Sequence, residues 1–304
     1  MMSRLTTPNP RQGLIDIGNS NLKAAVEPIA DSLRNRSTDY LSNPALIGNV
    51  QSLHWLPSGE TSKPPPQEWM ADPDTWVVPQ DVTAFQKLLG KLRHDQNVLD
   101  AGSIHWKISS VQPVALDTFK GCLAEFFPKD SWRVIDRSQI PIELDVEAPE
   151  RVGIDRLLAA WGAWKHYGIA GRQPLIVIQA GTAVTIDWIN ENGAFCGGAI
   201  MPGLTLSLKY MALGTAHLPW LAPPDRPSQT LLPGRNTREA VLAGASASFL
   251  GGIQYLVTRY RSQWSHGEVP VVVSGGDGIS LADSLSQPLH VVNHLVLAAL
   301  GCLD

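Results

Sequence analysis

A short segment near the start of the chain combines the groups that bind phosphate. Asp16 interrupts an apolar strand, a Gly/Asn/Ser turn follows at residues 18–21, and Lys23 stands two residues beyond it. Closely spaced backbone N–H groups and a lysine bind phosphate, while a carboxylate holds the accompanying metal ion. A tight hairpin would explain the glycine and asparagines equally well. It would not explain Asp16, because burying a carboxylate without a partner is costly.

Asp155 is the second candidate for chemistry, because it stands at the start of a predicted helix over residues 155–167. Leu157, Leu158, Trp161 and Trp164 have the spacing of one helical face, and a glycine follows at 168. A carboxylate in the first turn stabilises a helix end, so a capping role is one interpretation. The other is a general base that takes a proton from a substrate hydroxyl. The neighbouring Arg156 would then bind an anionic group through two parallel hydrogen bonds.

The layout around Asp16 recurs in the second half of the chain. Residues 178–183 again combine a strand, a polar residue (Gln179) and a glycine-containing turn before a second strand. Such a duplication predicts two similar hairpin-led domains facing each other. Gly181 and Thr182 would cradle further phosphates in the second hairpin. Glycine pairs at 197–198 and 275–276 also follow apolar strands, where they indicate either a turn or bulge or the close approach of a nucleotide.

Several further elements are needed to position these residues. Residues 14–17 and 22–27 read as a hairpin, and 236–263 as a long helix with Asn236 as its N-cap and Glu239 three residues later. The other predicted helices are 82–92 and 295–300, and the other predicted strands are 104–111, 175–178, 183–189 and 271–274. Residues 54–80 are rich in Pro and Trp, which predicts an irregular surface excursion.

Composition limits the classes of protein that this chain can belong to. A length of 304 residues, 44% hydrophobic and 17% charged, is typical of one or two globular domains. A net charge of −4 gives no general attraction to nucleic acid or to anionic membranes. No apolar run reaches the roughly 20 residues of a membrane span, and residues 1–12 lack a signal-peptide core. The three scattered cysteines predict a reduced, cytoplasmic protein without structural zinc.

Taken in order along the chain, six segments resemble the type III pantothenate kinases, of the acetate and sugar kinase/Hsp70/actin superfamily. The segments are Asp16–Lys23, Gly153–Arg156, Gly181–Asp187, Gly197–Gly203, Gly234–Thr237 and Ser274–Asp277. Each segment is weak by itself, whereas their joint order and spacing are specific.

The resemblance implies an α/β fold of two ribonuclease-H-like domains, the actin-like ATPase fold, facing each other across a nucleotide cleft. Residues 1–150 would form the N-terminal domain, and residues 151–304 the C-terminal domain with the catalytic aspartate and the dimer interface. The implied activity is ATP-dependent phosphorylation of pantothenate to 4'-phosphopantothenate, the first step of coenzyme A biosynthesis, by a cytoplasmic homodimer.

The resemblance also implies roles for individual residues. Asp155 would accept the proton, and Asp16 would help to place Mg²⁺. The implied pantothenate contacts are Gly153, Ile154, Asp155, Arg156 (near the carboxylate) and Thr237, the last supplied by the second subunit. The implied ATP contacts are Asp16, Ile17, Gly18, Asn19, Ser20, Asn21, Leu22, Lys23, Gly181 and Thr182.

Two departures from the family pattern qualify these roles. The family usually has an aspartate at the position of Gln179, where it holds a monovalent cation such as K⁺ or NH₄⁺. An amide oxygen coordinates K⁺ without adding charge, so Gln179 predicts a weaker cation dependence. A family tyrosine before the Gly153–Arg156 segment is replaced by Val146, which would remove one pantothenate contact.

Two alternatives stay open at this level. One is a related small-molecule kinase of the same superfamily that acts on another hydroxy acid. The other is a catalytically weakened, nucleotide-binding regulator, which Gln179 and Val146 favour and which Lys23 and the intact Asp155–Arg156 pair oppose. The acidic net charge argues against direct DNA binding.

Overall fold

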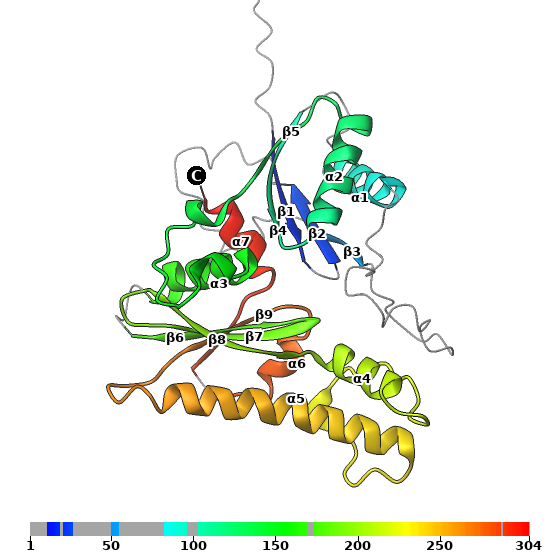
Figure 1. The fold of residues 1–304 in the computed structure, drawn as a ribbon, viewed down its shortest axis with the longest axis vertical. Helices are drawn as coiled ribbons and strands as arrows, with labels where there is room; N and C mark the ends of the chain where they lie inside the picture. Colours follow the sequence, from blue (N-terminus) through cyan, green and yellow to red (C-terminus); the bar gives the residue numbers. More distant parts are fainter. Residues whose placement is uncertain are drawn as a thin grey trace, which may run out of the picture.

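The computed structural model describes residues 11–18, 21–26, 50–54, 82–95, 103–168, 173–286 and 288–303. Within these ranges the chain forms two five-stranded sheets with helices around and between them (Figure 1). The excursion expected at 54–80 lies outside the described residues apart from His54, and Asn19 and Ser20 lie outside them as well.

The first sheet is built around the predicted hairpin. β1 (Arg11–Ile17) pairs antiparallel with β2 (Asn21–Val26), which pairs antiparallel with β3 (Gln51–His54). On its other side β1 pairs in parallel with β4 (Ile104–Ser110), which pairs in parallel with β5 (Ser131–Val134). The strand order is therefore β3-β2-β1-β4-β5.

The second sheet has the same plan. β6 (Leu175–Ala180), β7 (Ala183–Ile189) and β8 (Phe195–Pro202) form an antiparallel meander, and β9 (Val271–Ser274) and β10 (Leu289–Val291) add in parallel beside β6. The order β8-β7-β6-β9-β10 matches the first sheet strand for strand. This repeated mixed topology confirms the expected duplication and the pair of ribonuclease-H-like units. Every strand of the first sheet precedes residue 151, and every strand of the second follows it.

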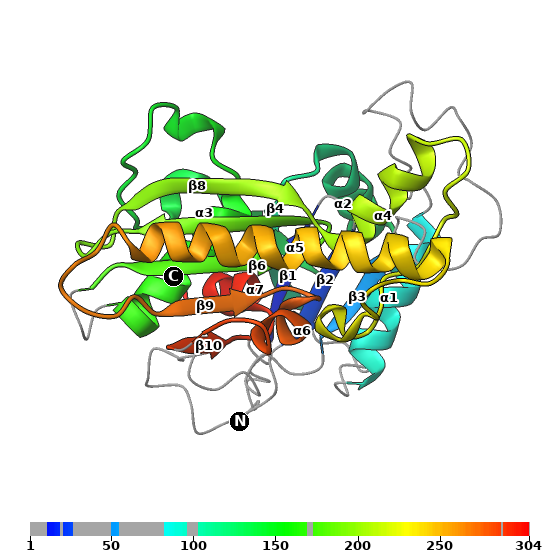
Figure 2. The ribbon, with the colours of Figure 1, turned by 90° about the horizontal axis from the view of Figure 1, so that it is seen from below.

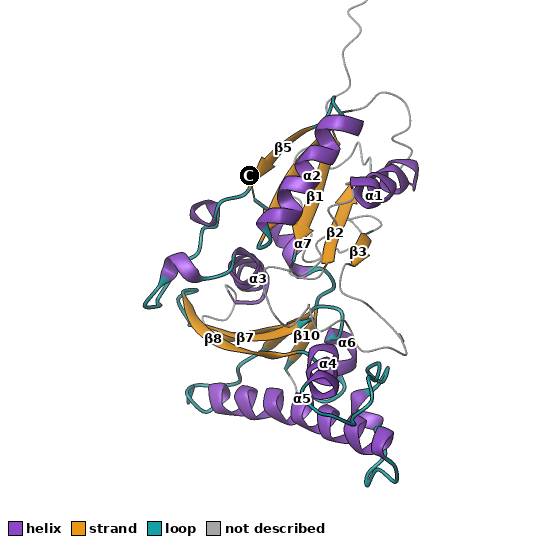
Figure 3. Cartoon of the chain, turned by 45° about the vertical axis from the view of Figure 1, so that its right-hand side comes forward, coloured by secondary structure: helices purple, strands orange, loops and turns teal. Residues whose placement is uncertain are grey.

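Helices fill three layers around the sheets. α1 (Val82–Asp95) and α2 (Pro113–Phe126) bury Phe85 and Phe119 against the outer face of the first sheet. α3 (Ile154–Ala163) and α7 (Leu295–Gly301) lie between the two sheets (Figure 3). The core around α3 and α7 includes Leu14 from the first sheet and Val177 from the second, so both helices join the two units.

The far face of the second sheet is covered by α5 (Thr237–Arg261), with α4 (Leu204–Leu213) and the short α6 (Gly278–Ala282) beside it (Figure 2). By length and composition alone α5 could cross a membrane. It is a core helix here, because Phe249 and Ile253 are buried against the sheet. Asn236 caps it as predicted, accepting a hydrogen bond from the Glu239 backbone N–H at 2.9 Å.

Two predictions about helices were incomplete. α3 ends at Ala163 and continues as a π-helical turn over Trp164–Gly168, in place of one helix to Tyr167. α2 was not predicted, although it begins at Pro113, where a proline fits the first turn, and the Gln112 side chain caps it.

A buried ion pair in the first unit yields a prediction about stability. The Asp130 carboxylate accepts hydrogen bonds from Arg93 on α1, from Ile104 N at 3.0 Å and from Trp106 Nε1 at 2.8 Å. We expect Asp130→Ala to lower the free energy of unfolding by about 3 kcal/mol, because it removes a buried carboxylate that pairs with Arg93 and accepts two further hydrogen bonds. Urea denaturation measures this. The control is Asp117→Ala, since Asp117 is exposed and pairs only loosely with Lys120 at 3.6 Å. Equal effects of the two variants would contradict the prediction.

Candidate active site

Asp16 is held at the middle of the first sheet by its neighbours in register. It lies opposite Lys23 on β2 and opposite Ser109 on β4, and it is 8% exposed. The Ser109 hydroxyl donates to its Oδ1 at 2.9 Å. Gln179 on β6 occupies the equivalent place in the second sheet, opposite Ser274 on β9. The two positions match in topology as well as in sequence.

Asp16 is a buried carboxyl group whose pKa is raised. Burial raises the pKa of Asp16 to about 6; Lys23 lowers it, Asp155 raises it and the Ser109 hydrogen bond lowers it. Asp155, from the other unit, thus contributes to the electrostatic environment of Asp16. A divalent cation would replace the solvation that burial removes.

Asp155 lies in the first turn of α3, as predicted. Its Oδ1 accepts a hydrogen bond from the Arg156 backbone N–H at 2.9 Å. A Cβ at position 153 would lie 2.5 Å from that oxygen, so a side chain there would displace the carboxylate from this position. Burial raises the pKa of Asp155, and the Arg156 N–H and charge oppose the rise. A carboxylate of raised pKa is a stronger base than an ordinary aspartate.

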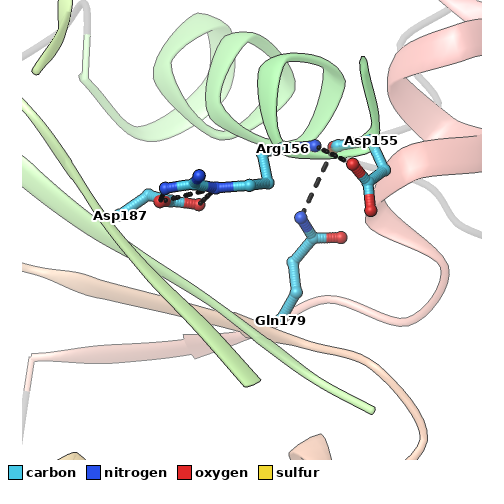
Figure 4. A network of polar contacts seen from close by, with 4 residues as sticks. All are labelled: Asp155, Arg156, Gln179 and Asp187. Atoms are coloured by element: carbon cyan, nitrogen blue, oxygen red, sulfur yellow. Dashed lines mark hydrogen bonds and ion pairs between the residues drawn. The ribbon is translucent and has the colours of Figure 1, made fainter. Parts of the chain in front are cut away.

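Arg156 reaches from α3 to Asp187 on β7, and Gln179 points from β6 toward the start of α3 (Figure 4). The Nε of Arg156 lies 3.1 and 3.3 Å from the two Asp187 oxygens, and Nη2 donates to Oδ1. Gln179 Nε2 donates to the Asp155 carbonyl at 3.4 Å. The expected substrate-binding arginine is thus already engaged along one edge.

Asp187 is a site residue that the sequence analysis did not single out. It is fully buried, and burial raises its pKa to about 6 against the hydrogen bonds and charge of Arg156. An acidic residue within an apolar strand is the same signal that identified Asp16, so the sequence could have indicated Asp187 as a site residue. His294, the residue before α7, has a φ of 55°, and burial followed by the charge of Lys23 lowers its pKa.

A different structural feature explains the glycine at each of these turns. A Cβ at Gly198 would collide with the Asp187 carboxylate, and Gly197 has a φ of +87° next to a bulge in β8. The first glycine pair therefore makes room for an acid and a bulge. Gly275 has a φ of +101° and packs against the Ala180 backbone, and Gly203 N donates to the Thr182 carbonyl at 2.9 Å.

The remaining predicted residues divide into two groups. The side chains of Ile17, Leu22 and Ile154 are buried, so only their backbones can meet a ligand. Thr237 is exposed at the start of α5, on the far side of the second sheet from α3. One copy of the chain does not bring Thr237 to Asp155. Val146 lies beside Gly197, with its Cγ1 3.6 Å from where a Cβ at that glycine would stand.

Comparison with known proteins identifies the family. The chain matches the model of the type III pantothenate kinases over residues 74–259, more than half its length. The chain belongs to the type III pantothenate kinase family. It is therefore a kinase.

Individual relatives agree with this assignment. A type III pantothenate kinase of Rhodopirellula baltica is 38% identical over 59% of this chain and 63% of its own length, slightly less than two thirds. One from Paramagnetospirillum magneticum is 34% identical over 82% of this chain and 89% of its own. A propionate kinase structure from Francisella tularensis aligns over 96% of this chain and 98% of its own, but a TM-score of 0.46 and 12% identity make that likeness too distant to indicate function.

Proposed function

We propose that this chain transfers the γ-phosphoryl group of ATP to the primary hydroxyl of pantothenate, which gives 4'-phosphopantothenate for coenzyme A synthesis. The observation that carries the proposal is the placement of Asp155. Its carboxylate, of raised pKa, stands at the start of α3, where a Cβ at Gly153 would touch Val111, whose N–H bonds the Ile17 carbonyl next to Asp16. A base is thus beside the segment that would hold the phosphates, in a family named for this reaction.

The residues would divide the reaction among them as follows. Asp155 takes the proton of the hydroxyl as its oxygen attacks the γ-phosphorus, and ADP leaves. Lys23 and the backbone of the first hairpin neutralise and position the phosphates, with Gly181 and Thr182 approaching from the second hairpin. Phosphoryl transfer needs mainly such positioning and charge neutralisation.

Mg²⁺ fits the residues that are present. The described residues contain no group of three or more His, Cys, Asp and Glu able to hold a metal. Mg²⁺ on a nucleotide, however, uses one or two carboxylates and takes its other ligands from phosphates and water. Asp16, a buried carboxylate with a raised pKa, would be that ligand. When bound, the ion would neutralise charge that develops on the transferred group.

The monovalent cation is part of the same proposal, with Gln179 as its neutral ligand. We expect Gln179→Asp to increase the stimulation of kcat by K⁺, because a carboxylate adds the charge that the amide lacks. Steady-state rates with and without K⁺ measure this. Gln263→Asp, at an exposed position after α5, is the control. An unchanged response to K⁺ in Gln179→Asp would contradict the proposed site.

The second unit offers a surface for the proposed homodimer. The outer side of α5 exposes Gly244, Ala247, Ser248 and Gly251, and a Cβ at either glycine would meet nothing within 4 Å. Tyr255 on the same helix is 65% exposed, and Ile200 on the edge strand β8 is 63% exposed. Small residues allow close helix packing and the two large side chains would be covered by it. A Thr237 contributed by a second copy could then reach the pantothenate site.

A cytoplasmic location completes the proposal. Cys122, Cys196 and Cys302 are all free thiols, which suits a reducing compartment.

A coupled assay of ADP release across a panel of hydroxy acids, with and without K⁺, tests the substrate. We expect pantothenate to give the highest kcat/KM. Turnover of a different hydroxy acid with none for pantothenate would favour a related small-molecule kinase instead. ATP binding without turnover of any acid would favour a regulator.

A further inference from the structure

Asp187 and Arg156 form an ion pair between the second sheet and α3 in which several hydrogen bonds fix the geometry. Asp187 is fully buried on β7, and it takes the Nε–Nη2 edge of the guanidinium with both of its oxygens. The side chain of Arg156 is 14% exposed. A side-on pair of this kind fixes the plane and direction of a guanidinium.

The surrounding residues hold the Arg156 guanidinium in this one orientation. Gly198 faces Asp187 across the sheet, and any side chain there would collide with the carboxylate. The Phe195 ring lies under the guanidinium, with its centroid 5.3 Å from Cζ. The carboxylate and the ring therefore restrain Arg156 from two directions. Among the described residues none is bonded to Nη1, so one edge of the guanidinium stays available.

The free edge of the guanidinium belongs to Arg156, which is next to Asp155, the proposed catalytic base. A substrate whose hydroxyl meets Asp155 extends from there across neighbouring surface, and pantothenate carries a carboxylate at the end opposite its primary hydroxyl. An arginine already paired on one edge binds a second carboxylate on the remaining edge, with its orientation settled in advance.

We propose that Asp187 is a positioning residue for substrate specificity, which holds Arg156 so that its free edge receives the substrate carboxylate. The inference rests on the proposed function and deepens it. Asp187 would touch neither substrate nor ATP, and its influence would be confined to substrates that carry a carboxylate.

The test combines Asp187→Asn with two substrates, pantothenate and the neutral analogue in which an alcohol replaces the carboxylate. For pantothenate we expect KM to rise on the order of tenfold in the variant, because a charge-assisted contact loses its orientation. The kcat and the KM for ATP should change less than twofold (roughly the scatter of mutant kinetics). For the neutral analogue, wild type and variant should give the same KM.

Matched variants separate positioning from folding. Asp130→Asn weakens the other buried Asp–Arg pair, in the first unit, and should lower Tm without changing either KM. Arg156→Lys keeps the charge but loses the planar fork, so it should show the same selective loss for pantothenate even if Asp187→Asn folds poorly. Isothermal titration with each substrate reports affinity independently of turnover.

Two results would overturn the inference. If Asp187→Asn and Arg156→Lys weaken the acid and the neutral analogue equally, or weaken neither, Asp187 is a purely structural residue while the proposed function stands. If wild type turns over the neutral analogue but not pantothenate, the carboxylate is not recognised and both proposals fail.

Discussion

Asp155→Asn is expected to lower kcat about a thousandfold while the fold stays intact, which is within the range for removal of a general base. Asparagine has nearly the same shape and can still accept the hydrogen bond from the Arg156 N–H. It cannot take a proton. Steady-state kinetics with saturating pantothenate and ATP give kcat, and thermal unfolding gives the stability of the same preparation.

A cap-only residue provides the control. Asp136 caps a short 3₁₀ helix, accepting from the Ser138 N–H at 2.9 Å, and its side chain is exposed. Asp136→Ala should lower stability through the loss of this cap and leave kcat unchanged. If Asp155→Asn behaves like Asp136→Ala, with reduced stability and retained turnover, Asp155 is a helix cap and not the base.

Asp16→Asn is expected to move activity and stability in opposite directions. Activity should fall about a hundredfold or more, because the proposed ligand for Mg²⁺ is lost. Stability at pH 7 should rise, because a buried carboxylate is replaced by a neutral amide that still accepts from Ser109. The difference between the ordinary pKa of 3.8 and the value of about 6 in the fold, at 1.36 kcal/mol per unit, corresponds to about 3 kcal/mol.

The sign of this effect fixes its pH dependence. A carboxyl group whose pKa is raised by folding holds its proton more tightly in the folded state. Its stabilising contribution is therefore present below about pH 3.8 and is lost as the pH rises through about 6. The advantage of Asp16→Asn over wild type should accordingly grow between pH 4 and pH 7 (roughly the interval between the two pKa values). Urea denaturation across this range measures it, and an advantage that shrinks toward neutral pH would contradict the account.

The sequence predicted the fold well because its signals were local. The paired strands around Asp16, the strands around Gln179 and the Asn236 cap each depend on residues a few positions apart, and each was found where expected. The repeated hairpin layout also predicted two units of one topology, which the matching strand orders confirm. The domain limits at 150 and 151 stay a prediction, since α3 and α7 pack in a core shared by both units.

The site was less predictable, because its decisive contacts join distant residues. Arg156 was expected to bind an anionic group of the substrate, but the sequence did not indicate that Asp187, 31 residues away, occupies the Nε–Nη2 edge of its guanidinium. Nothing local indicates that Gly198 exists to make room for that carboxylate, which depends on the register of β7 with β8. Thr237 is separated from Asp155 by the second sheet, a consequence of topology that no motif records.

The proposed function depends most on the identity of the phosphoryl acceptor, which product analysis tests directly. Purified protein would be incubated with ATP, Mg²⁺ and pantothenate, and the products identified by mass spectrometry alongside the Asp155→Asn variant. Wild type is expected to give 4'-phosphopantothenate and ADP in equal amounts, and the variant is expected to give almost none of either product. ADP release from wild type without phosphorylated pantothenate, or equal product from both proteins, would contradict the proposed function.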